Sequence, residues 1–291
     1  MASAFIGILG GSGLYQMNGL KDVQERAIDT PYGSPSDLIV TGRLAGVPVA
    51  FLARHGRGHR LLPSEVPFRA NIHALKQLGV RYLVSVSAVG SLCEAMRPLD
   101  VVLPDQFIDF TRRRDSTFFG QGVVAHVSMA QPVCPALADL LAKAARDLIA
   151  GTDRALHERA TYVCIEGPQF SSQAESRMYQ QLGAHLIGMT NMPEAKLARE
   201  AEIAYATMAM VTDYDCWHPR EAHVSADQAI ANLMQNAELG QRILAEVIPM
   251  IARESPRSIA HTALDSALVT RPESMADPVR QRMRAILGSR I

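Results

Sequence analysis

The sequence lacks several features that would assign it to a common class of protein. Among 291 residues, 29 lysines and arginines balance 29 aspartates and glutamates, so that the formal net charge is zero. A protein that binds duplex nucleic acid or a membrane surface carries an excess of basic residues, so neither partner is expected. The stretch 118–138 has no formal charge, but its two prolines and two glycines exclude a membrane-spanning helix.

Paired cysteines and a leader segment are also lacking. The four cysteines, at positions 93, 134, 164 and 216, form no CxxC pair, which is typical of free thiols in a reducing compartment. No basic segment precedes an apolar core at the amino terminus, so no secretory signal is expected. We therefore expect a cytoplasmic enzyme.

Three nucleotide and nucleophile motifs are absent. Gly10-Gly-Ser-Gly13 follows a short apolar run, but counted from Gly11 the third glycine of GxGxxG is replaced by Gln16. Neither a GKS or GKT triphosphate loop nor a GxSxG nucleophile turn is found. The glycine loop can still approach an anion through its backbone N–H groups, and Ser12 offers a hydroxyl.

The alternation of apolar runs with helical stretches predicts an α/β fold. A hairpin around 42–48 gives the sheet at least one antiparallel pair, and no repeat or flexible linker divides the chain. The segment 254–275 is either an extended arm, over the surface or onto a neighbouring subunit, or a disordered tail. Strands are expected at 5–9, 38–41, 47–53, 82–86, 101–103, 161–165, 185–189 and 203–211, and helices at 64–78, 135–149, 173–182, 193–201, 226–253 and 277–287.

A basic loop follows the strand that ends at residue 53. Arg54, His55, Arg57 and His59 are separated by two glycines, which argue against a helical pair of histidines on a metal. Loops at strand ends often carry function, and arginines suit the bidentate binding of phosphate. The alternative is a solvated charged turn.

Two further loops combine small polar residues with glycine. Residues 85–91 end a buried strand in hydroxyl side chains, where Ser87 and backbone amides could bind an oxyanion, although the segment could be only a turn. The loop 165–172 contains Glu166, Phe170 and Ser171. An aromatic face there could stack on a planar heterocycle, or Phe170 could fill the core instead.

Two acids follow the strand at 203–211. If that strand continues, Asp213 and Asp215 project from the same face, because side chains alternate with period two. Like charges at short range raise the pKa of one acid, so one could donate a proton while the other accepts. A 6-aminopurine needs a donor to N7 and an acceptor for its amino group. The alternatives are two solvated turn acids or a metal site.

Taken in order, these stretches resemble the trimeric purine nucleoside phosphorylase family, and within it the methylthioadenosine phosphorylases. The resemblance covers roughly residues 5–250. Its most specific portions are Gly10-Gly-Ser-Gly13, Asp29-Thr-Pro-Tyr-Gly33, Leu52-Ala-Arg-His-Gly56, the stretch 165–172, Met189-Thr190 and the stretch 212–217.

The resemblance implies a site residue by residue. Alanines at positions 226 and 229, where relatives have larger aliphatic residues, predict a roomier thioalkyl pocket. The implied phosphate site is Ser12, Arg54, His55, Ser87, the backbone N–H of Ala88, and Thr190. Met189 would contact the ribose. The residues around the adenine would be Phe170, Ser171, Asp213 and Asp215. The residues around the 5′-methylthio end would be His59, Ala226, Ala229, Ile230 and, from a neighbouring chain, His126.

The resemblance also implies the fold and the reaction. We expect a homotrimer with a mixed central sheet flanked by helices, a nucleoside phosphorylase domain over 1–255 and a C-terminal arm over 256–291. The implied reaction is phosphorolysis of 5′-methylthioadenosine in purine and methionine salvage, with phosphate as co-substrate and no metal or other cofactor. Adenosine, methylthioinosine, inosine and guanosine are alternative substrates, and a non-catalytic nucleoside-binding module is a distant alternative.

Overall fold

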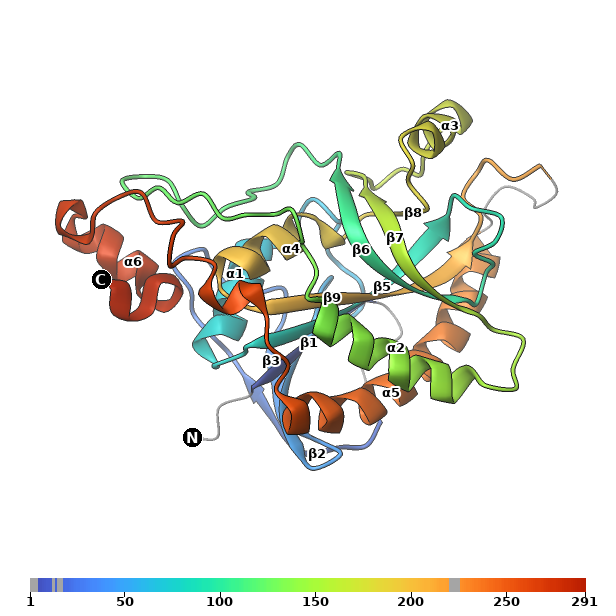
Figure 1. Cartoon of the computed structure of the whole chain (residues 1–291), viewed down its shortest axis with the longest axis horizontal. Coiled ribbons are helices and arrows are strands. Elements are labelled where there is room, and N and C mark those ends of the chain that lie inside the picture. Colours follow the sequence, from blue (N-terminus) through green and yellow to red (C-terminus); the bar gives the residue numbers. More distant parts are fainter. Residues whose placement is uncertain (1–4, 12–13, 15–17, 220–225) are drawn as a thin grey trace.

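The computed structural model describes residues 5–11, 14, 18–219 and 226–291, with the backbone alone for 226–230. Figure 1 shows a twisted sheet between helices. The strands are β1 (Ile6–Gly10), β2 (Leu20–Arg26), β3 (Ile39–Leu44), β4 (Val47–Ala53), β5 (Tyr82–Ser91), β6 (Val101–Asp109), β7 (Leu156–Cys164), β8 (Leu186–Gly188) and β9 (Ala204–Asp213). The helices are α1 (Phe68–Gln77), α2 (Pro135–Ile149), α3 (Gln173–Gln181), α4 (Asn191–Glu200), α5 (Ala226–Glu254) and α6 (Asp277–Leu287).

The sheet is mixed, and part of it closes on itself. Its order is β2-β3-β4-β1-β5-β8-β7-β6-β9, and β9 pairs with β5 as well as with β6. Strands β4, β1, β5 and β9 run parallel to one another in the centre, whereas β3 is antiparallel to both β2 and β4, β8 to β5, and β6 to β9. The α/β fold with a mixed central sheet is therefore confirmed.

Helices cover both faces of the sheet. On one face, α1, α4 and α6 pack on a core that contains Ile72, Leu197 and Met283. On the other face, α2 and α5 pack on a core that contains Leu141 and Val247. Both cores consist of side chains that are almost completely buried, so the strands between them read as continuous apolar runs.

The C-terminal segment after α5 packs against its own chain. It contains three short 3₁₀ turns and α6, which lies at the far left of Figure 1. Ala125 forms an isolated bridge with Leu268, which ties this segment to the long excursion between β6 and α2. The apolar face of α6 is buried through Met283, Ile286 and Leu287.

Most predicted elements are found, with three differences. Helix α1 begins at Phe68 and not at Ser64, because residues 63–65 form a turn and Pro67 disfavours helical geometry before it. The bounds of three strands also differ markedly, since β5 and β6 continue well past their predicted ends and β7 begins at Leu156, before its predicted start at 161. Strand β2 was not predicted, because this edge strand is largely exposed and has charged or polar residues at five of its seven positions.

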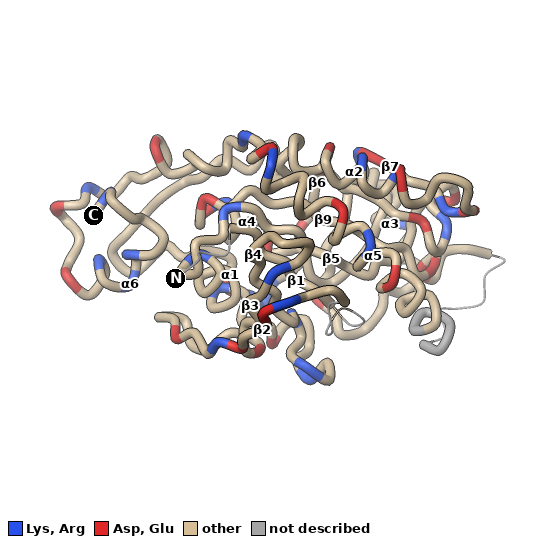
Figure 2. The backbone as a smooth tube through the Cα atoms, turned by 90° about the horizontal axis from the view of Figure 1, so that it is seen from below, with Lys and Arg blue, Asp and Glu red and all other residues tan. Residues whose placement is uncertain are grey.

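Charged residues of both signs are distributed over the whole molecule. Figure 2 shows acidic and basic positions interspersed along the backbone. Such a mixed pattern lacks the one-signed stripe that would attract a nucleic acid. Among the residues that the structure describes, no helix combines the length and the apolar character that a bilayer span requires.

Candidate active site

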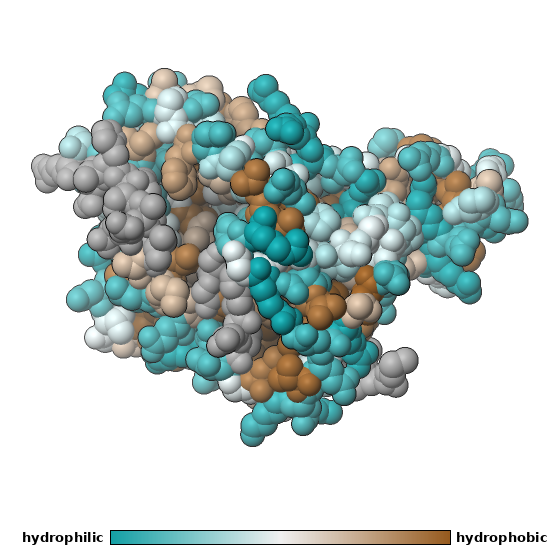
Figure 3. Space-filling model, turned by 180° about the vertical axis from the view of Figure 1, so that it is seen from behind, coloured by the Kyte–Doolittle hydropathy of each residue, from teal (hydrophilic) through white to brown (hydrophobic). Residues whose placement is uncertain are grey.

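A cavity of about 410 Å³ lies at the carboxyl ends of β4, β5, β7 and β9. Figure 3 shows a recess with apolar walls on one face of the molecule. The side chains that line it come from both halves of the chain. Eleven predicted site residues are among them: Arg54, His55, His59, Ser87, Ala88, Phe170, Ser171, Met189, Thr190, Asp213 and Asp215.

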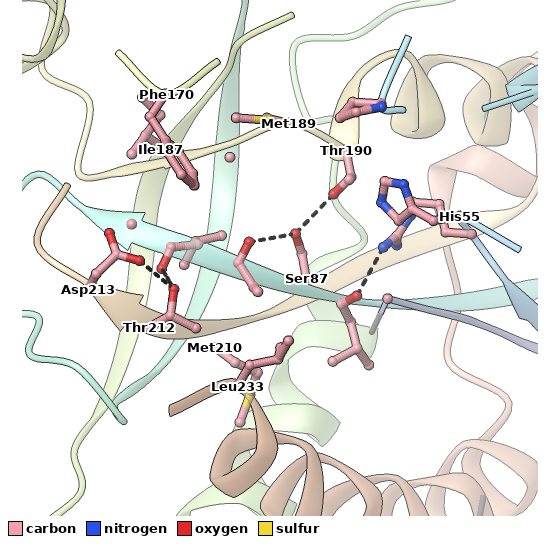
Figure 4. A pocket seen from close by; sticks show the side chains of 18 of the residues that line it. His55, Ser87, Phe170, Ile187, Met189, Thr190, Met210, Thr212, Asp213 and Leu233 are labelled. Carbon is pink, nitrogen blue, oxygen red and sulfur yellow. Dashed lines mark hydrogen bonds between the residues drawn. The ribbon is translucent and has the colours of Figure 1, made fainter. Parts of the chain in front are cut away.

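The predicted phosphate residues and the predicted base residues occupy opposite ends of this one cavity. In Figure 4, Thr190 and His55 lie at one end, and Asp213 and Phe170 at the other. Ser87 lies nearer the middle of the view, where it is joined to Thr190. A molecule that spanned the cavity could therefore contact both groups at once.

Two hydroxyls meet at the phosphate end. Strand β8 pairs antiparallel with β5, opposing Ile187 to Gly90, and the same register carried onward brings Thr190 opposite Ser87. The Ser87 Oγ and Thr190 Oγ1 atoms are 3.0 Å apart. Because a hydroxyl can donate in any direction about its C–O bond, this pair can turn toward an oxyanion in the cavity.

The Arg54 guanidinium is already occupied by protein acceptors. It is 1% exposed, and its Nε and Nη2 atoms donate to the Glu194 carboxylate at 2.7 and 3.3 Å. Nη2 also donates to Ser85 Oγ at 2.6 Å, and Nη1 to the Val86 carbonyl at 3.1 Å. Burial alone would lower the pKa of Arg54, but the Glu194 carboxylate raises it above its usual value.

This arrangement corrects the expectation of bidentate phosphate binding by the basic loop. Among the described residues, every N–H of Arg54 but one on Nη1 has an acceptor, so Arg54 can give an anion one hydrogen bond and its positive charge. Arg57 points away from the cavity and pairs with Glu25 and Asp37 at the surface. The basic loop therefore combines both alternatives: Arg54 lies at the cavity, and Arg57 lies at the surface.

His55 offers an acceptor. Its Nδ1 lies 3.0 Å from the Leu61 carbonyl, so Nδ1 must carry the proton and Nε2 is left as an acceptor in the neutral ring. Burial and the Arg54 charge lower the pKa of His55 to about 4. The ring stacks on His59, with centroids 4.3 Å apart. At neutral pH His55 can therefore accept a hydrogen bond from the hydroxyl group of a partly protonated anion, such as hydrogen phosphate.

The base end carries the two acids, although not through strand alternation. Strand β9 ends at Asp213, and Asp215 has a left-handed φ of 52°. The Asp215 backbone N–H donates to Asp213 Oδ1 at 2.9 Å, and both residues line the cavity. Parallel pairing puts Gly90 beside Asp213, and a Cβ at Gly90 would lie 3.0 Å from Asp213 Oδ1.

The environment of these acids favours their protonated forms. Burial raises the pKa of Asp213, although the Thr212 hydroxyl, which donates to Oδ2 at 2.6 Å, opposes the rise. Burial also raises the pKa of Asp215, and the nearby Asp213 charge adds to the effect. Ser176 donates to the Asp215 carboxylate. Burial thus favours the protonated form of each acid, and with one of them protonated the pair would offer one proton donor and one acceptor.

Comparisons with known proteins identify the family of the chain. The model of the Phosphorylase superfamily matches residues 5–249. The chain belongs to the phosphorylase superfamily. It is 57% identical to an S-methyl-5′-thioadenosine phosphorylase of Synechocystis over 99% of this chain and 88% of that protein. The corresponding protein of Thermosynechococcus vestitus is 55% identical, with 98% of this chain and 99% of the relative covered.

Solved structures of superfamily members have the same fold. A methylthioadenosine phosphorylase from an Antarctic soil metagenomic library superposes with a TM-score of 0.94 at 62% identity, over 98% of this chain and 99% of that chain. The methylthioadenosine phosphorylase of Schistosoma mansoni in complex with adenine superposes with a TM-score of 0.82 at 38% identity, over 86% and 93% of the two chains.

Five predicted site residues of this superfamily member are not placed in the cavity. Ser12 lies outside the described residues, and so do the side chains of Ala226, Ala229 and Ile230, although α5 begins at Ala226. His126 does not line the cavity of its own chain. It lies on the excursion between β6 and α2, where its backbone N–H donates to the Ala267 carbonyl at 2.9 Å. Its contribution to a neighbouring site stays a prediction.

The sequence analysis missed the polar residues behind the cavity and its apolar walls. Glu194 is 1% exposed and accepts hydrogen bonds from Arg54, from the Ser85 hydroxyl at 2.6 Å and from the Tyr205 hydroxyl at 2.8 Å. A glutamate in the stretch 192–198, where Lys196 is the other charged residue, was the only local signal. The missed walls are core positions by their pattern, and they include Leu14, Ile187, Met210, Leu233 and Ala237.

Proposed function

We propose that the chain catalyses the phosphorolysis of 5′-methylthioadenosine to adenine and 5-methylthioribose 1-phosphate. One observation carries the proposal: two neighbouring acids and an exposed aromatic ring share a cavity with a hydroxyl pair, an arginine and a neutral histidine. A nucleoside-binding module would need only the first group. The names of the relatives at 57% and 62% identity support the same substrate.

The phosphate end is suited to hold inorganic phosphate below the sugar. Ser87 and Thr190 would donate to its oxygens, and Arg54 would contribute charge and one N–H. His55, which is neutral, would accept from the phosphate hydroxyl. Met189 lies between the two ends of the cavity, where it would contact the ribose. Catalysis at this end is positioning of the nucleophile.

The base end is suited to an amino-bearing purine. The Phe170 ring is 65% exposed and lines the cavity, so it offers a face on which adenine could stack. As the glycosidic bond breaks, phosphate attacks the anomeric carbon through an oxocarbenium-like transition state, and negative charge develops on the base. Asp213, when protonated, would donate to N7, and Asp215 would accept from the amino group.

The rival substrates differ at the base and at the 5′ position. A carboxylate would face the O6 lone pairs of inosine, guanosine or methylthioinosine unfavourably, so Asp213 and Asp215 favour adenosine-type substrates. Adenosine itself differs only by its 5′-hydroxyl, which an apolar pocket disfavours by only about a hundredfold. A structure of the Schistosoma mansoni relative bears the name adenosine/methylthioadenosine phosphorylase, so both substrates belong in the assay.

The oligomeric state, the cellular compartment and the cofactor requirement also form part of the proposal. The chain would work as a cytoplasmic homotrimer, in which residues 1–255 carry catalysis and His126 reaches the neighbouring site. No metal or organic cofactor would be needed. Among the described residues, no group of three or more histidines, cysteines, aspartates or glutamates is arranged to hold a metal ion.

The test is adenine release from methylthioadenosine with and without phosphate. Strictly phosphate-dependent release would support the proposal, and the same assay with adenosine and methylthioinosine would rank the substrates. Release without phosphate would point to a hydrolase, and binding without any release would point to a non-catalytic module. Sedimentation of the purified protein would test the trimer separately.

A further inference from the structure

One arginine outside the cavity contacts both loops that form it. Arg114 follows β6, and its side chain is 1% exposed. Nε donates to Glu166 Oε1 at 2.9 Å, and Nη1 to the carbonyls of Met189 and Met192 at 2.7 and 2.6 Å. Nη2 donates to the carbonyls of Glu166 and Ile165 at 2.8 and 3.3 Å. All five N–H groups of the guanidinium therefore have an acceptor.

The acceptors belong to two separate loops with different predicted tasks. Ile165 and Glu166 begin the loop after β7, which carries Phe170 at the base end. Met189 precedes Thr190 on the connection from β8 to α4, and Met192 follows it in the first turn of α4, at the phosphate end. A single buried cation thus joins the loop for the base to the loop for the ribose and the phosphate.

Glu166 fixes the segment on which Arg114 lies. Its Oε2 accepts the backbone N–H groups of Arg112 and Arg113 at 2.6 and 2.9 Å, and its Oε1 accepts from Arg114. Burial alone would raise the pKa of Glu166, but these N–H groups and the Arg114 charge lower it, so the side chain stays ionised. Glu166 does not line the cavity. It acts on the loops and not on a ligand.

We propose that Arg114 is a positioning residue for phosphorolysis, because it fixes the separation of these two loops. The distance from the phosphate oxygen to the anomeric carbon depends on that separation, since one loop holds the base and the other contributes to the phosphate site. Lysine has three donors and no planar fork, so it cannot replace five directed hydrogen bonds. This inference rests on the proposed function.

The first experiment measures kcat and both KM values in Arg114→Lys. A misplacement of about 1 Å between reactants costs about a hundredfold in rate, so we expect kcat to fall by about that factor. Each loop keeps its own contacts with its ligand, so the KM values for phosphate and for methylthioadenosine should change by no more than about threefold. All rates are expressed per folded enzyme, measured by near-ultraviolet circular dichroism.

A matched control is available on the same side of the sheet. Arg199 is 4% exposed and donates to the carbonyls of Ser128, at 2.9 Å, and Gln131, neither of which lines the cavity. Arg199→Lys should lose a similar amount of thermal stability and keep its kcat. An equal loss of kcat in the two variants would mean that replacing any buried arginine lowers kcat. That result would overturn the inference.

Chemical rescue separates positioning from general damage. Ethylguanidine added to Arg114→Ala should restore part of kcat, whereas ethylamine should not, because only the former supplies the planar fork. An unchanged kcat in Arg114→Lys, or a loss of kcat that ethylguanidine does not reverse, would overturn the inference while the wild type remains active. A wild type without phosphate-dependent turnover would instead contradict the proposed function.

Discussion

The two ends of the cavity are built in different ways. At the phosphate end, Arg54 and Glu194 are each 1% exposed and are held within a network that reaches Ser85 and Tyr205. At the base end, Phe170 is 65% exposed, and Asp213 and Asp215 lie where β9 has ended. One end is part of the core, and the other lies on loops.

This difference predicts how substitutions will act. At the phosphate end the groups stabilise the fold and bind the anion at the same time, so changes should affect both stability and activity. At the base end the acids are partly buried with raised pKa values, which costs stability, so their removal should affect activity alone. Substitutions at each end of the cavity can test this division.

The largest effect is expected from Asp213→Asn. Loss of the acid should lower kcat for methylthioadenosine by about two to four orders of magnitude, the range for a positioned general acid. Stability should not fall, because the change removes a buried ionisable group. Steady-state kinetics together with urea unfolding would check both points. Equal activity of Asp213→Asn would remove this residue from the mechanism.

The next effect is expected from Glu194→Leu, which leaves the Arg54 charge buried without its partner. Such a loss costs about 3–5 kcal/mol of unfolding free energy. The control is Glu158→Gln, which breaks an exposed pair with Arg146 that is worth no more than about 1 kcal/mol. Urea unfolding of both variants makes the comparison. Similar losses would show that the phosphate end is not part of the stabilising core.

A smaller effect concerns the pH dependence of stability through His55. Its folded pKa, about 4, lies below the unfolded value of 6.5, so the unfolded state takes up the proton first as the pH falls. The stability from the neutral ring is therefore present above pH 6.5 and is lost as the pH falls toward 4. Between pH 7 and 5, urea unfolding should show a loss about 2 kcal/mol smaller in His55→Gln than in the wild type. Parallel losses would contradict the low pKa.

The smallest effect is expected from Phe170→Ala. Loss of an aromatic contact worth about 0.5–1.5 kcal/mol should raise the KM for methylthioadenosine by up to about tenfold. Because the ring is exposed, the unfolding free energy should stay within about 0.5 kcal/mol of the wild type. Val269→Ala, at an apolar side chain that is 62% exposed and does not line the cavity, serves as the control. A large loss of stability in Phe170→Ala would mean that the ring belongs to the core.

Much of the fold could be predicted because its local signals agree with one another. Helices α2 and α6 have the bounds that their apolar periodicity and first-turn prolines predict. Strand β2 could not be predicted, since an exposed edge strand needs no apolar pattern. The start of α1 was wrong because Ser64 resembles a helix cap, whereas Pro67 further along the chain decides the boundary.

Many residues of the candidate site could be named from the sequence, but the contacts between them could not. Eleven of the named residues line one cavity, because polar residues at the ends of neighbouring strands converge there. The ion pair between Arg54 and Glu194 could not be predicted, since the two residues are 140 positions apart. Asp213 and Asp215 were expected to meet along a strand, but a turn brings them together.

The order of residue types along the chain by itself determined which chemistry this protein can perform: acids after one strand, hydroxyls after another, and a basic loop after a third. Those properties depend on side chains and on neighbours within a few positions. Only the tertiary structure decided how the groups share the work, because burial and pairing depend on residues far apart in the chain. Packing of α4 against the sheet brings Glu194 to the guanidinium of Arg54, and the turn at Asp215 brings the two acids together.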